Sequence, residues 1–206
     1  MKRMIWGLIW VLGLVPLAQA QKFQEGVHYV EIPFAEPLEN GSRVEVREFF
    51  WYGCPHCYSL EPVLERWLKR KPRNVDFVRT PAFLPRRLVH AKTYYAFQSL
   101  ENSDKLHAAF FRAYHEQGQR FASQAEVARW LAAQGADVGK FNKAYSSFGV
   151  DHQVKLAQSL AGKYGINSVP TLVIEGRYLT TASMAGGHEG MMRVVDYLVK
   201  KVASGK

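Results

Sequence analysis

The order in which strand and helix patterns follow one another constrains the fold of this chain more than any other feature of its sequence. Strand patterns gather β-branched and aromatic residues, whereas helix patterns repeat apolar residues every three or four positions. The patterns follow in the order strand 43–52, helix after Pro55, strand 74–80, helices from 88 to about 163, strands 171–174 and 178–180, and helix 189–202. We therefore predict an α/β domain that is interrupted by an all-helical insertion.

The first strand and helix are the most clearly marked. Residues 43–52 (RVEVREFFWY) lie between Gly41-Ser42 and Gly53, as expected for a strand bounded by turns. Pro55 suits the first turn of a helix, and an apolar stripe follows it: Leu60, Val63, Leu64, Trp67 and Leu68. Pro62 lies within this stripe, where we expect it to kink the helix.

Residues 88–163 contain no strand pattern and indicate successive helices. Ser123-Gln124-Ala125-Glu126 has the form of a capping box, and Gly165 ends a further helix pattern at 154–164. With short crossings near residues 87 and 157, the predicted division is an α/β domain at 21–86 and 158–206 and a helical insertion at 87–157.

Length and composition limit the class of protein. The chain has 206 residues, of which 48% are hydrophobic and 22% are charged, so one domain, or one domain with an insertion, can bury a core. The length excludes a large multidomain protein, and the composition argues against disordered, collagen-like and low-complexity proteins.

The first twenty residues have the pattern of a cleaved export signal. Met1-Lys2-Arg3 is basic, residues 5–18 are mostly apolar, and Ala18-Gln19-Ala20 has the small-x-small form of a cleavage site. An uncleaved membrane anchor is the alternative, but the apolar run is shorter than the roughly 18 residues expected of a spanning helix. We expect a soluble exported protein that begins near Gln21.

The formal net charge of +9 could suggest nucleic acid or an anionic membrane as a partner, and removal of Lys2 and Arg3 lowers it by two charges. The basic residues are scattered, however. The densest groups are short, namely Lys69-Arg70-Lys71 with Arg73, and Arg86-Arg87. We interpret them as solvated surface and predict no nucleic-acid partner.

The chemistry is concentrated at Cys54-Pro55-His56-Cys57, which contains both cysteines of the chain. Two cysteines exclude a disulfide-stapled miniprotein and any four-cysteine zinc or iron–sulfur site. At a strand-to-helix junction, Cys54 would lie at a helix N-terminus, where backbone N–H groups favour a thiolate. His56 could add a donor or a positive charge, and Cys57 can close a disulfide. Stabilising the Cys54 thiolate makes that disulfide easier to reduce, so we expect the pair to donate it to other thiols.

Three other interpretations of the cysteine pair are weaker. An inert structural disulfide fits an exported protein, but so small a loop constrains little of the unfolded chain. A zinc site needs about four ligands, and only scattered histidines could complete it. Covalent haem attachment needs histidine directly after the second cysteine, and Tyr58 stands there instead.

Several motifs together resemble one known family. Glu48-Phe49-Phe50, the run from Cys54 to Tyr58, the helical insertion and Val169-Pro170-Thr171 are similar to those of the DsbA family of periplasmic thiol:disulfide oxidants. The resemblance covers essentially the whole chain after residue 20. It implies a thioredoxin fold interrupted by an all-helical insertion domain, and a protein disulfide oxidoreductase of the DsbA type.

The resemblance assigns roles within the motif. Cys54 matches the nucleophile that receives the mixed disulfide with substrate, and Cys57 matches the buried partner that completes the exchange. His56, preceded by Pro55, matches the residue that stabilises the Cys54 thiolate.

It also assigns roles outside the motif. Pro170 matches a cis-proline that lies against the active-site disulfide, and Val169 would offer backbone groups to an extended substrate. Glu48 and Glu61 match acidic residues that are buried behind the active site and tune the cysteines or pass a proton, with Arg79 as a basic partner. Without the resemblance, Glu48 and Glu61 would be interpreted as exposed residues of a strand and a helix.

Other residues carry less information. Trp51, Tyr52 and Tyr58 could form an apolar surface for unfolded substrates, although strand aromatics more often belong to the core. Gly186-Gly187-His188 could form a loop near the cysteine motif, but its composition is more typical of a plain turn before the last helix. The remaining histidines show no shared ligand spacing and are interpreted as ordinary surface or core residues: His28, His90, His107, His115 and His152.

We therefore expect a monomeric oxidase of the Gram-negative periplasm that transfers its Cys54–Cys57 disulfide to reduced, unfolded exported proteins. By the resemblance, a quinone-linked membrane partner of the DsbB type reoxidises the pair, and no soluble cofactor or metal is needed. A disulfide isomerase or reductase of the same fold would instead keep the pair reduced. A non-catalytic module that binds unfolded proteins would keep its function after Cys54→Ser.

Overall fold

The computed structural model describes residues 23–33, 41–82 and 88–205. The predicted export signal at residues 1–20 lies outside the described residues, as do Arg86-Arg87 and the domain boundary predicted beside them. In the described part of the chain, no helix is long and apolar enough to cross a membrane.

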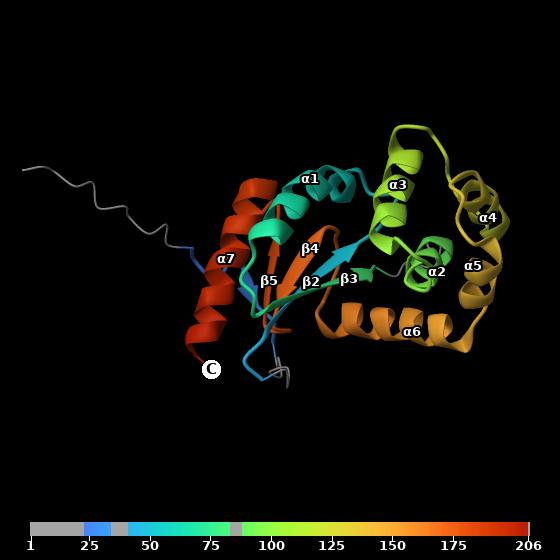
Figure 1. Cartoon of the computed structure of the whole chain (residues 1–206). Coiled ribbons are helices and arrows are strands. Elements are labelled where there is room, and N and C mark those ends of the chain that lie inside the picture. The colour runs from blue at the N-terminus through green and yellow to red at the C-terminus, as the bar shows by residue number, and fades with distance from the viewer. Residues whose placement is uncertain (1–22, 34–40, 83–87, 206) are drawn as a thin grey trace, which may run out of the picture.

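A five-stranded sheet forms the centre of the molecule, with the strand order β1-β5-β4-β2-β3 (Figure 1). Its strands are β1 Val30–Glu31, β2 Val44–Phe50, β3 Val75–Pro81, β4 Thr171–Ile174 and β5 Tyr178–Thr181. Helix α1 (Pro55–Arg70) joins the parallel strands β2 and β3, whereas β4 and β5 run antiparallel to their neighbours. In this register Glu48 lies opposite Arg79, so two charged residues meet within the sheet.

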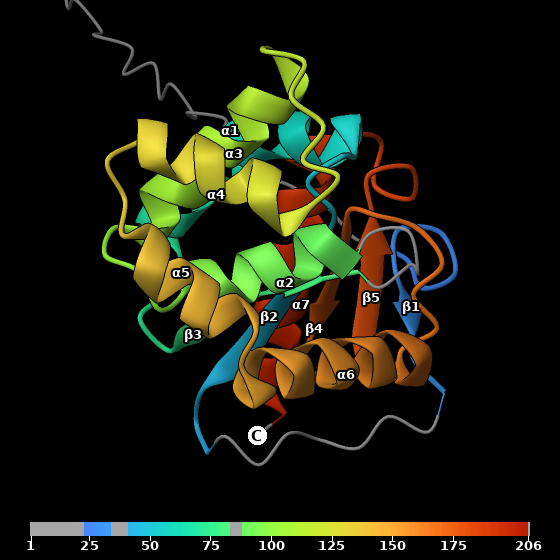
Figure 2. The same ribbon diagram turned by 90° about the vertical axis from the view of Figure 1, so that its right-hand side faces the viewer.

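Helices cover both faces of the sheet. Helices α1 and α7 (His188–Ser204) lie on one face, and α6 (Phe148–Lys163) lies on the other, as the turned view shows (Figure 2). The predicted α/β domain with a helical insertion is confirmed.

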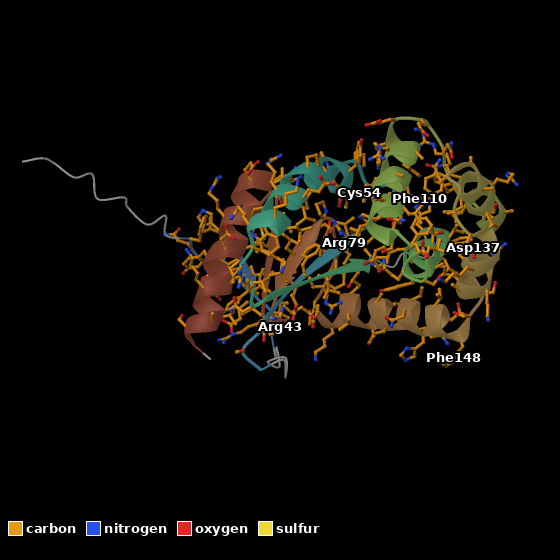
Figure 3. The ribbon with its side chains drawn as sticks, viewed as in Figure 1. Arg43, Cys54, Arg79, Phe110, Asp137 and Phe148 are labelled. Atoms are coloured by element: carbon orange, nitrogen blue, oxygen red, sulfur yellow. The ribbon has the colours of Figure 1, made fainter. Side chains whose placement is uncertain are left out.

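Between β3 and β4, the described residues form helices joined by turns and loops, and no strand. The helices are α2 Leu88–Phe97, α3 Ser103–His115, α4 Gln124–Ala133, α5 Val138–Tyr145 and α6. Figure 3 shows Phe110 of α3 beside Cys54, in the middle of the molecule, where the insertion meets the start of α1. Phe50, Cys57 and Phe110 belong to one buried cluster. The aromatic core of the insertion is therefore continuous with the cysteine motif.

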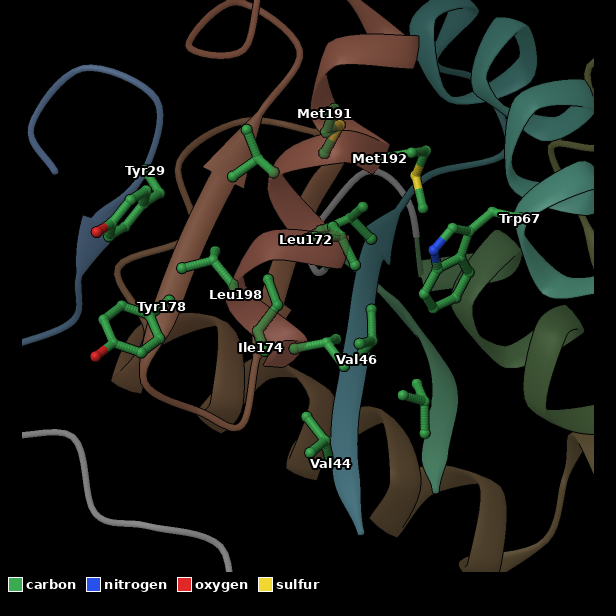
Figure 4. Packing of buried hydrophobic residues seen from close by; sticks show 14 of the residues in the cluster. Tyr29, Val44, Val46, Trp67, Leu172, Ile174, Tyr178, Met191, Met192 and Leu198 are labelled. Atoms are coloured by element: carbon green, nitrogen blue, oxygen red, sulfur yellow. The ribbon is translucent and has the colours of Figure 1, made fainter. Parts of the chain in front are cut away.

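A second buried cluster fills the space between the sheet and the helices α1 and α7 (Figure 4). Its members include Val46, Leu172 and Ile174 of the sheet, Trp67 of α1, and Met191, Met192 and Leu198 of α7. The Trp67 indole N–H donates to the Asp196 carboxylate at 2.7 Å. This packing holds α1 against both the sheet and α7, and thereby fixes the N-terminus of α1.

Some element ends differ from those predicted. The strand expected at 43–52 is Val44–Phe50, and the helix expected at 154–164 begins at Phe148, where Ser147 caps it by accepting a hydrogen bond from the Val150 N–H at 3.2 Å. Residue 157, the expected second crossing, lies inside α6. The two-residue strand β1 was not predicted, because two residues show no periodicity. Helix α1 continues across Pro62.

Asp137 caps the N-terminus of α5, and its carboxylate accepts a hydrogen bond from the Lys140 N–H at 2.8 Å. Asp137→Ala should therefore lower the free energy of unfolding by about 1 kcal/mol, the usual loss for a helix cap. Urea denaturation measures this loss. Asp137→Asn keeps an acceptor and should recover most of it, whereas an unchanged Asp137→Ala protein would contradict the cap.

Candidate active site

The turn after β2 places Cys54 at the N-terminus of α1. Cys54 is the N-cap residue, with extended backbone angles (φ -89°, ψ 117°), and Pro55 follows in the first turn of the helix. The Cys54 N–H donates to the Trp51 carbonyl at 2.9 Å and closes the turn. Cys54 and Cys57 are both buried free thiols. The strand-to-helix junction expected from the sequence is therefore present, with the cysteine pair on it.

The two thiols differ strongly in acidity. A hydrogen bond from Cys57, the backbone N–H groups of Cys57 and His56, and the charge of His56 together lower the pKa of Cys54 to about 6, although burial opposes this. Burial, the hydrogen bond with Cys54 and the charge of Glu48 raise the pKa of Cys57 far above that of an ordinary thiol. At pH 7 about nine tenths of Cys54 is therefore thiolate, and Cys57 is protonated.

Val169-Pro170 lies against Cys54. The Cys54 thiol donates to the Val169 carbonyl at 3.3 Å, and the Val169-Pro170 peptide bond is cis. Thr171, the first residue of β4, donates its hydroxyl to the Ser168 carbonyl at 2.8 Å and secures this loop. Pro170 is buried and Val169 is half-buried. A chain bonded to the Cys54 sulfur would therefore meet the Val169 backbone.

Glu48, Glu61 and Arg79 form a buried charged group that acts on the cysteines. Arg79 Nε lies 3.2 Å from Glu48 Oε2, and Arg79 Nη2 donates to Glu61 Oε2 at 3.2 Å. Glu48 is fully buried, and burial together with the charge of Glu61 raises its pKa to about 8 against the opposing charge of Arg79. Burial also disfavours ionised Glu61, but the neighbouring His107 and Arg79 outweigh it and lower the pKa of Glu61. Near pH 7 Glu48 therefore holds a proton, while Glu61 and Arg79 are ionised.

His107 of α3 completes this group, although no motif in the sequence marks it as a site residue. Its Nδ1 lies 2.8 Å from the Tyr52 hydroxyl, and its Nε2 lies 3.6 Å from Glu61 Oε1. The ring is buried, and burial lowers the pKa of His107 despite the nearby carboxylate. Its place beside Phe110 on the apolar stripe of α3 is the one sequence signal that it is buried.

The aromatic residues that flank the motif differ in exposure. Tyr52 is buried in the core of the insertion, whereas Trp51 and Tyr58 are half-buried. The Trp51 indole N–H donates to His90 Nδ1 at 2.9 Å. Of the three residues considered as a binding surface, only Trp51 and Tyr58 thus present part of their side chains beside the motif.

Gly186-Gly187-His188 forms a turn that leads into α7, as expected. His188 nevertheless lies close enough to His56 to sense its charge: burial and the charge of His56 both lower the pKa of His188. In the part of the chain that the structure describes, no three His, Cys, Asp or Glu side chains are grouped to hold a metal ion.

Comparisons with known proteins find relatives over nearly the whole chain. A family model described as "DSBA-like thioredoxin domain" matches residues 86–199. The thiol:disulfide interchange protein DsbA of Burkholderia cepacia is 39% identical over 211 residues. The match covers 100% of this chain and 100% of that protein. That of Pseudomonas aeruginosa strain PAO1 is 37% identical over 185 residues, which cover 89% of this chain and 88% of the relative.

Solved structures agree with these matches. The crystal structure of Pseudomonas aeruginosa DsbA, 37% identical, has a TM-score of 0.84 and covers 89% of this chain and 97% of its own. Reduced DsbA1 from Neisseria meningitidis, 26% identical, has a TM-score of 0.79 over 90% of this chain and 98% of its own. The fold is therefore a thioredoxin fold with a helical insertion, as predicted.

Proposed function

The chain belongs to the DsbA family of thiol:disulfide interchange proteins, and we propose that it acts as the oxidant in this exchange. Its active site is the Cys54–Cys57 pair. One observation carries the proposed direction: the structure stabilises the Cys54 thiolate and lowers the pKa of Cys54 to about 6. A stabilised thiolate favours the reduced pair, so the disulfide passes readily to other thiols.

The proposed exchange consists of two displacements at sulfur. A substrate thiolate attacks Cys54 of the oxidised pair, the Cys54–Cys57 bond breaks, and its electron pair goes to Cys57. A second substrate thiolate then attacks the substrate sulfur of the mixed disulfide and releases Cys54 as a thiolate. Two electrons thus pass from the substrate to the pair, and the substrate gains a disulfide. The low pKa of Cys54 makes it a good leaving group in the second step.

Cys57 needs a proton when it leaves, and Glu48 is the proposed donor. The raised pKa of Cys57 makes its thiolate unfavourable. Glu48 is near enough to act on the pKa of Cys57 once it is ionised, and near pH 7 it still holds a proton that it can give up. Glu61 holds Arg79 by an ion pair, and Arg79 in turn contacts Glu48. We assign Glu61 as a positioning residue in this group.

The substrates proposed are reduced, unfolded exported proteins. An extended chain would lie along Val169-Pro170, because the Val169 carbonyl is 3.3 Å from the Cys54 sulfur and offers a backbone acceptor there. Trp51 and Tyr58, both half-buried, would contact apolar side chains next to the substrate cysteine. Such contacts depend little on sequence, which suits varied substrates.

We place this activity in the Gram-negative periplasm, with the protein acting as a monomer and with a quinone-linked membrane protein of the DsbB type as its reoxidant. The support is the export-signal pattern at residues 1–20 and the similarity to DsbA proteins of Burkholderia and Pseudomonas.

Mixing the oxidised protein, residues 21–206, with a reduced, unfolded two-cysteine peptide tests the direction of exchange. We expect the peptide to gain one disulfide for each protein molecule reduced, as measured by alkylation and mass spectrometry. A protein that leaves the peptide reduced, but reduces an oxidised peptide, is a reductase or an isomerase and contradicts the proposal.

His56→Ala should raise the pKa of Cys54 part of the way toward that of an ordinary thiol. The variant loses the positive charge of His56 but keeps the backbone N–H groups and the Cys57 thiol that also stabilise the thiolate. The redox equilibrium between the Cys54–Cys57 pair and glutathione should therefore shift toward the Cys54–Cys57 disulfide, by up to about tenfold for each unit by which the pKa of Cys54 rises. His152→Ala, at an exposed position on α6, is the control. If His56→Ala leaves the pKa of Cys54 unchanged, His56 does not stabilise the Cys54 thiolate.

A further inference from the structure

Helix α3 contacts Tyr52 at three points that are each one helical turn apart. His107 Nδ1 lies 2.8 Å from the Tyr52 hydroxyl, the centroid of the Phe111 ring lies 4.9 Å from that of Tyr52, and His115 Nε2 lies 2.7 Å from the Tyr52 carbonyl oxygen. Residues four apart lie on one face of a helix, so these three side chains form one line along α3. Tyr52 belongs to the turn that leads into Cys54, and the insertion therefore holds that turn.

His115 also contacts the other side of the motif. Its ring lies parallel to that of Tyr58, with 4.8 Å between the centroids and 4° between the planes. The Tyr58 hydroxyl donates to the carboxylate of Glu116, the next residue along the chain from His115. Tyr58 directly follows Cys57. The end of α3 thus contacts residues on both sides of Cys54-Pro55-His56-Cys57.

The hydrogen bond between His115 and Tyr52 is directional. A carbonyl oxygen only accepts, so His115 Nε2 must carry the hydrogen. Nε2 carries it both in the neutral tautomer that is protonated at Nε2 and in the doubly protonated ring, so the bond does not require a charged ring. His115 lies in the last turn of α3.

We infer that His115 is a positioning residue, which fixes the turn at residues 51–54 against the helical insertion and thereby sets how readily the Cys54–Cys57 disulfide is reduced. The N–H groups of His56 and Cys57 stabilise the Cys54 sulfur only if the turn holds that sulfur in line with them. A carbonyl anchored two residues before Cys54 restricts the rotation of the turn. The inference concerns the thiol pair itself, so it stands or fails independently of the direction of exchange.

Two substitutions separate the hydrogen bond from the ring. His115→Phe keeps an aromatic ring on Tyr58 but has no donor for the Tyr52 carbonyl, whereas His115→Gln has an N–H donor but no ring. His115→Ala is a second variant without a donor, at a half-buried position where alanine favours the helix. The control is His152→Phe on α6, because exposed His152 also stacks on an aromatic ring, that of Phe148.

Each variant is titrated by the ultraviolet absorbance of its Cys54 thiolate and equilibrated with reduced and oxidised glutathione. We expect His115→Phe and His115→Ala to raise the pKa of Cys54 and to shift the equilibrium toward the disulfide by about threefold or more. His115→Gln should stay within about twofold of wild type, and His152→Phe should match it.

Two results would overturn the inference. The first is that His115→Phe and His115→Ala, which both lack the donor, keep the Cys54 pKa and the glutathione equilibrium of wild type. This result would count against the inference even if their melting temperatures fall, because a purely structural role changes stability alone. The second is an equal shift in His115→Gln and His115→Phe, which would assign the effect to the imidazole group that both variants lack rather than to the hydrogen bond.

Discussion

Cys57→Ser should react with oxidised glutathione at pH 7 at least about a hundredfold faster than Cys54→Ser, and both should lose catalysis of disulfide formation. Serine at position 57 can still donate a hydrogen bond to Cys54, so Cys54 stays largely a thiolate and attacks. The Cys57 thiol left in Cys54→Ser is fully buried and has a strongly raised pKa, so it stays protonated and inaccessible. Mass spectrometry of samples quenched at intervals gives both rates.

The same pair of variants tests the assignment of the nucleophile. With a disulfide-bonded peptide, Cys57→Ser should accumulate the mixed disulfide through Cys54. The Cys54 thiolate attacks the peptide disulfide, and Cys57, which would displace the peptide sulfur, is missing. Equal rates for the two variants, or a mixed disulfide through Cys57, would contradict the assignment. If Cys54→Ser still assists the folding of substrate proteins as wild type does, a non-catalytic module that binds unfolded proteins is favoured instead.

Glu48→Gln should stabilise the reduced protein at pH 8 by on the order of 4 kcal/mol, the second large effect that we expect. The pKa of Glu48 is about 8 in the folded protein, whereas an ordinary glutamate carboxyl has a pKa of 4.5. Between these values the folded state keeps a proton that the unfolded state loses, so the contribution of Glu48 to wild-type stability falls as the pH rises from 4.5 to about 8. The opposite contribution of Cys54 is the same in wild type and variant, so it cancels in their difference. Glutamine does not titrate and can still accept a hydrogen bond from Arg79.

Urea denaturation between pH 4.5 and pH 8 measures this effect. The advantage of Glu48→Gln should be largest at pH 8 and should shrink toward pH 4.5, where Glu48 is protonated in the folded state and begins to be protonated in the unfolded state. Glu65→Gln, at an exposed position on the same helix as Glu61, should follow the wild-type curve. A Glu48→Gln curve parallel to that of wild type would show that Glu48 is ionised in the folded state at these pH values.

Local patterns were sufficient to predict the junction that carries the cysteines. A strand of β-branched and aromatic residues, a glycine, and a proline suited to the first turn of a helix follow one another within residues 43–55. Each of these signals depends on residues that are neighbours in the chain, so it can be recognised in a single sequence. The chemistry expected of Cys54 followed from that junction alone.

The buried charges could not be deduced in the same way. Glu48 stands in a strand where alternation would also allow a solvent-facing side chain, and only the resemblance to the DsbA family suggested its burial. What permits that burial is Arg79, which the parallel pairing of β2 with β3 places opposite Glu48. Pairing between strands separated by a whole helix is a tertiary property.

His107 and His115 show the limit of reasoning from spacing. Both were interpreted as ordinary histidines, yet each contacts Tyr52, from which they are separated by 55 and 63 positions in the chain. These contacts depend on how the insertion packs on the active-site turn, which no local pattern contains. The i, i+4, i+8 spacing of His107, Phe111 and His115 does predict a shared helical face.

The most direct test of this account is the acidity of Cys54, measured by the pH dependence of its thiolate absorbance together with the redox equilibrium of the pair with glutathione. We expect Cys54 to titrate near pH 6 and the pair to be reduced even by weakly reducing glutathione buffers. If Cys54 titrates as an ordinary thiol, and the pair stays oxidised until a strong reductant is added, then the stabilised thiolate is absent and the oxidase proposal is wrong.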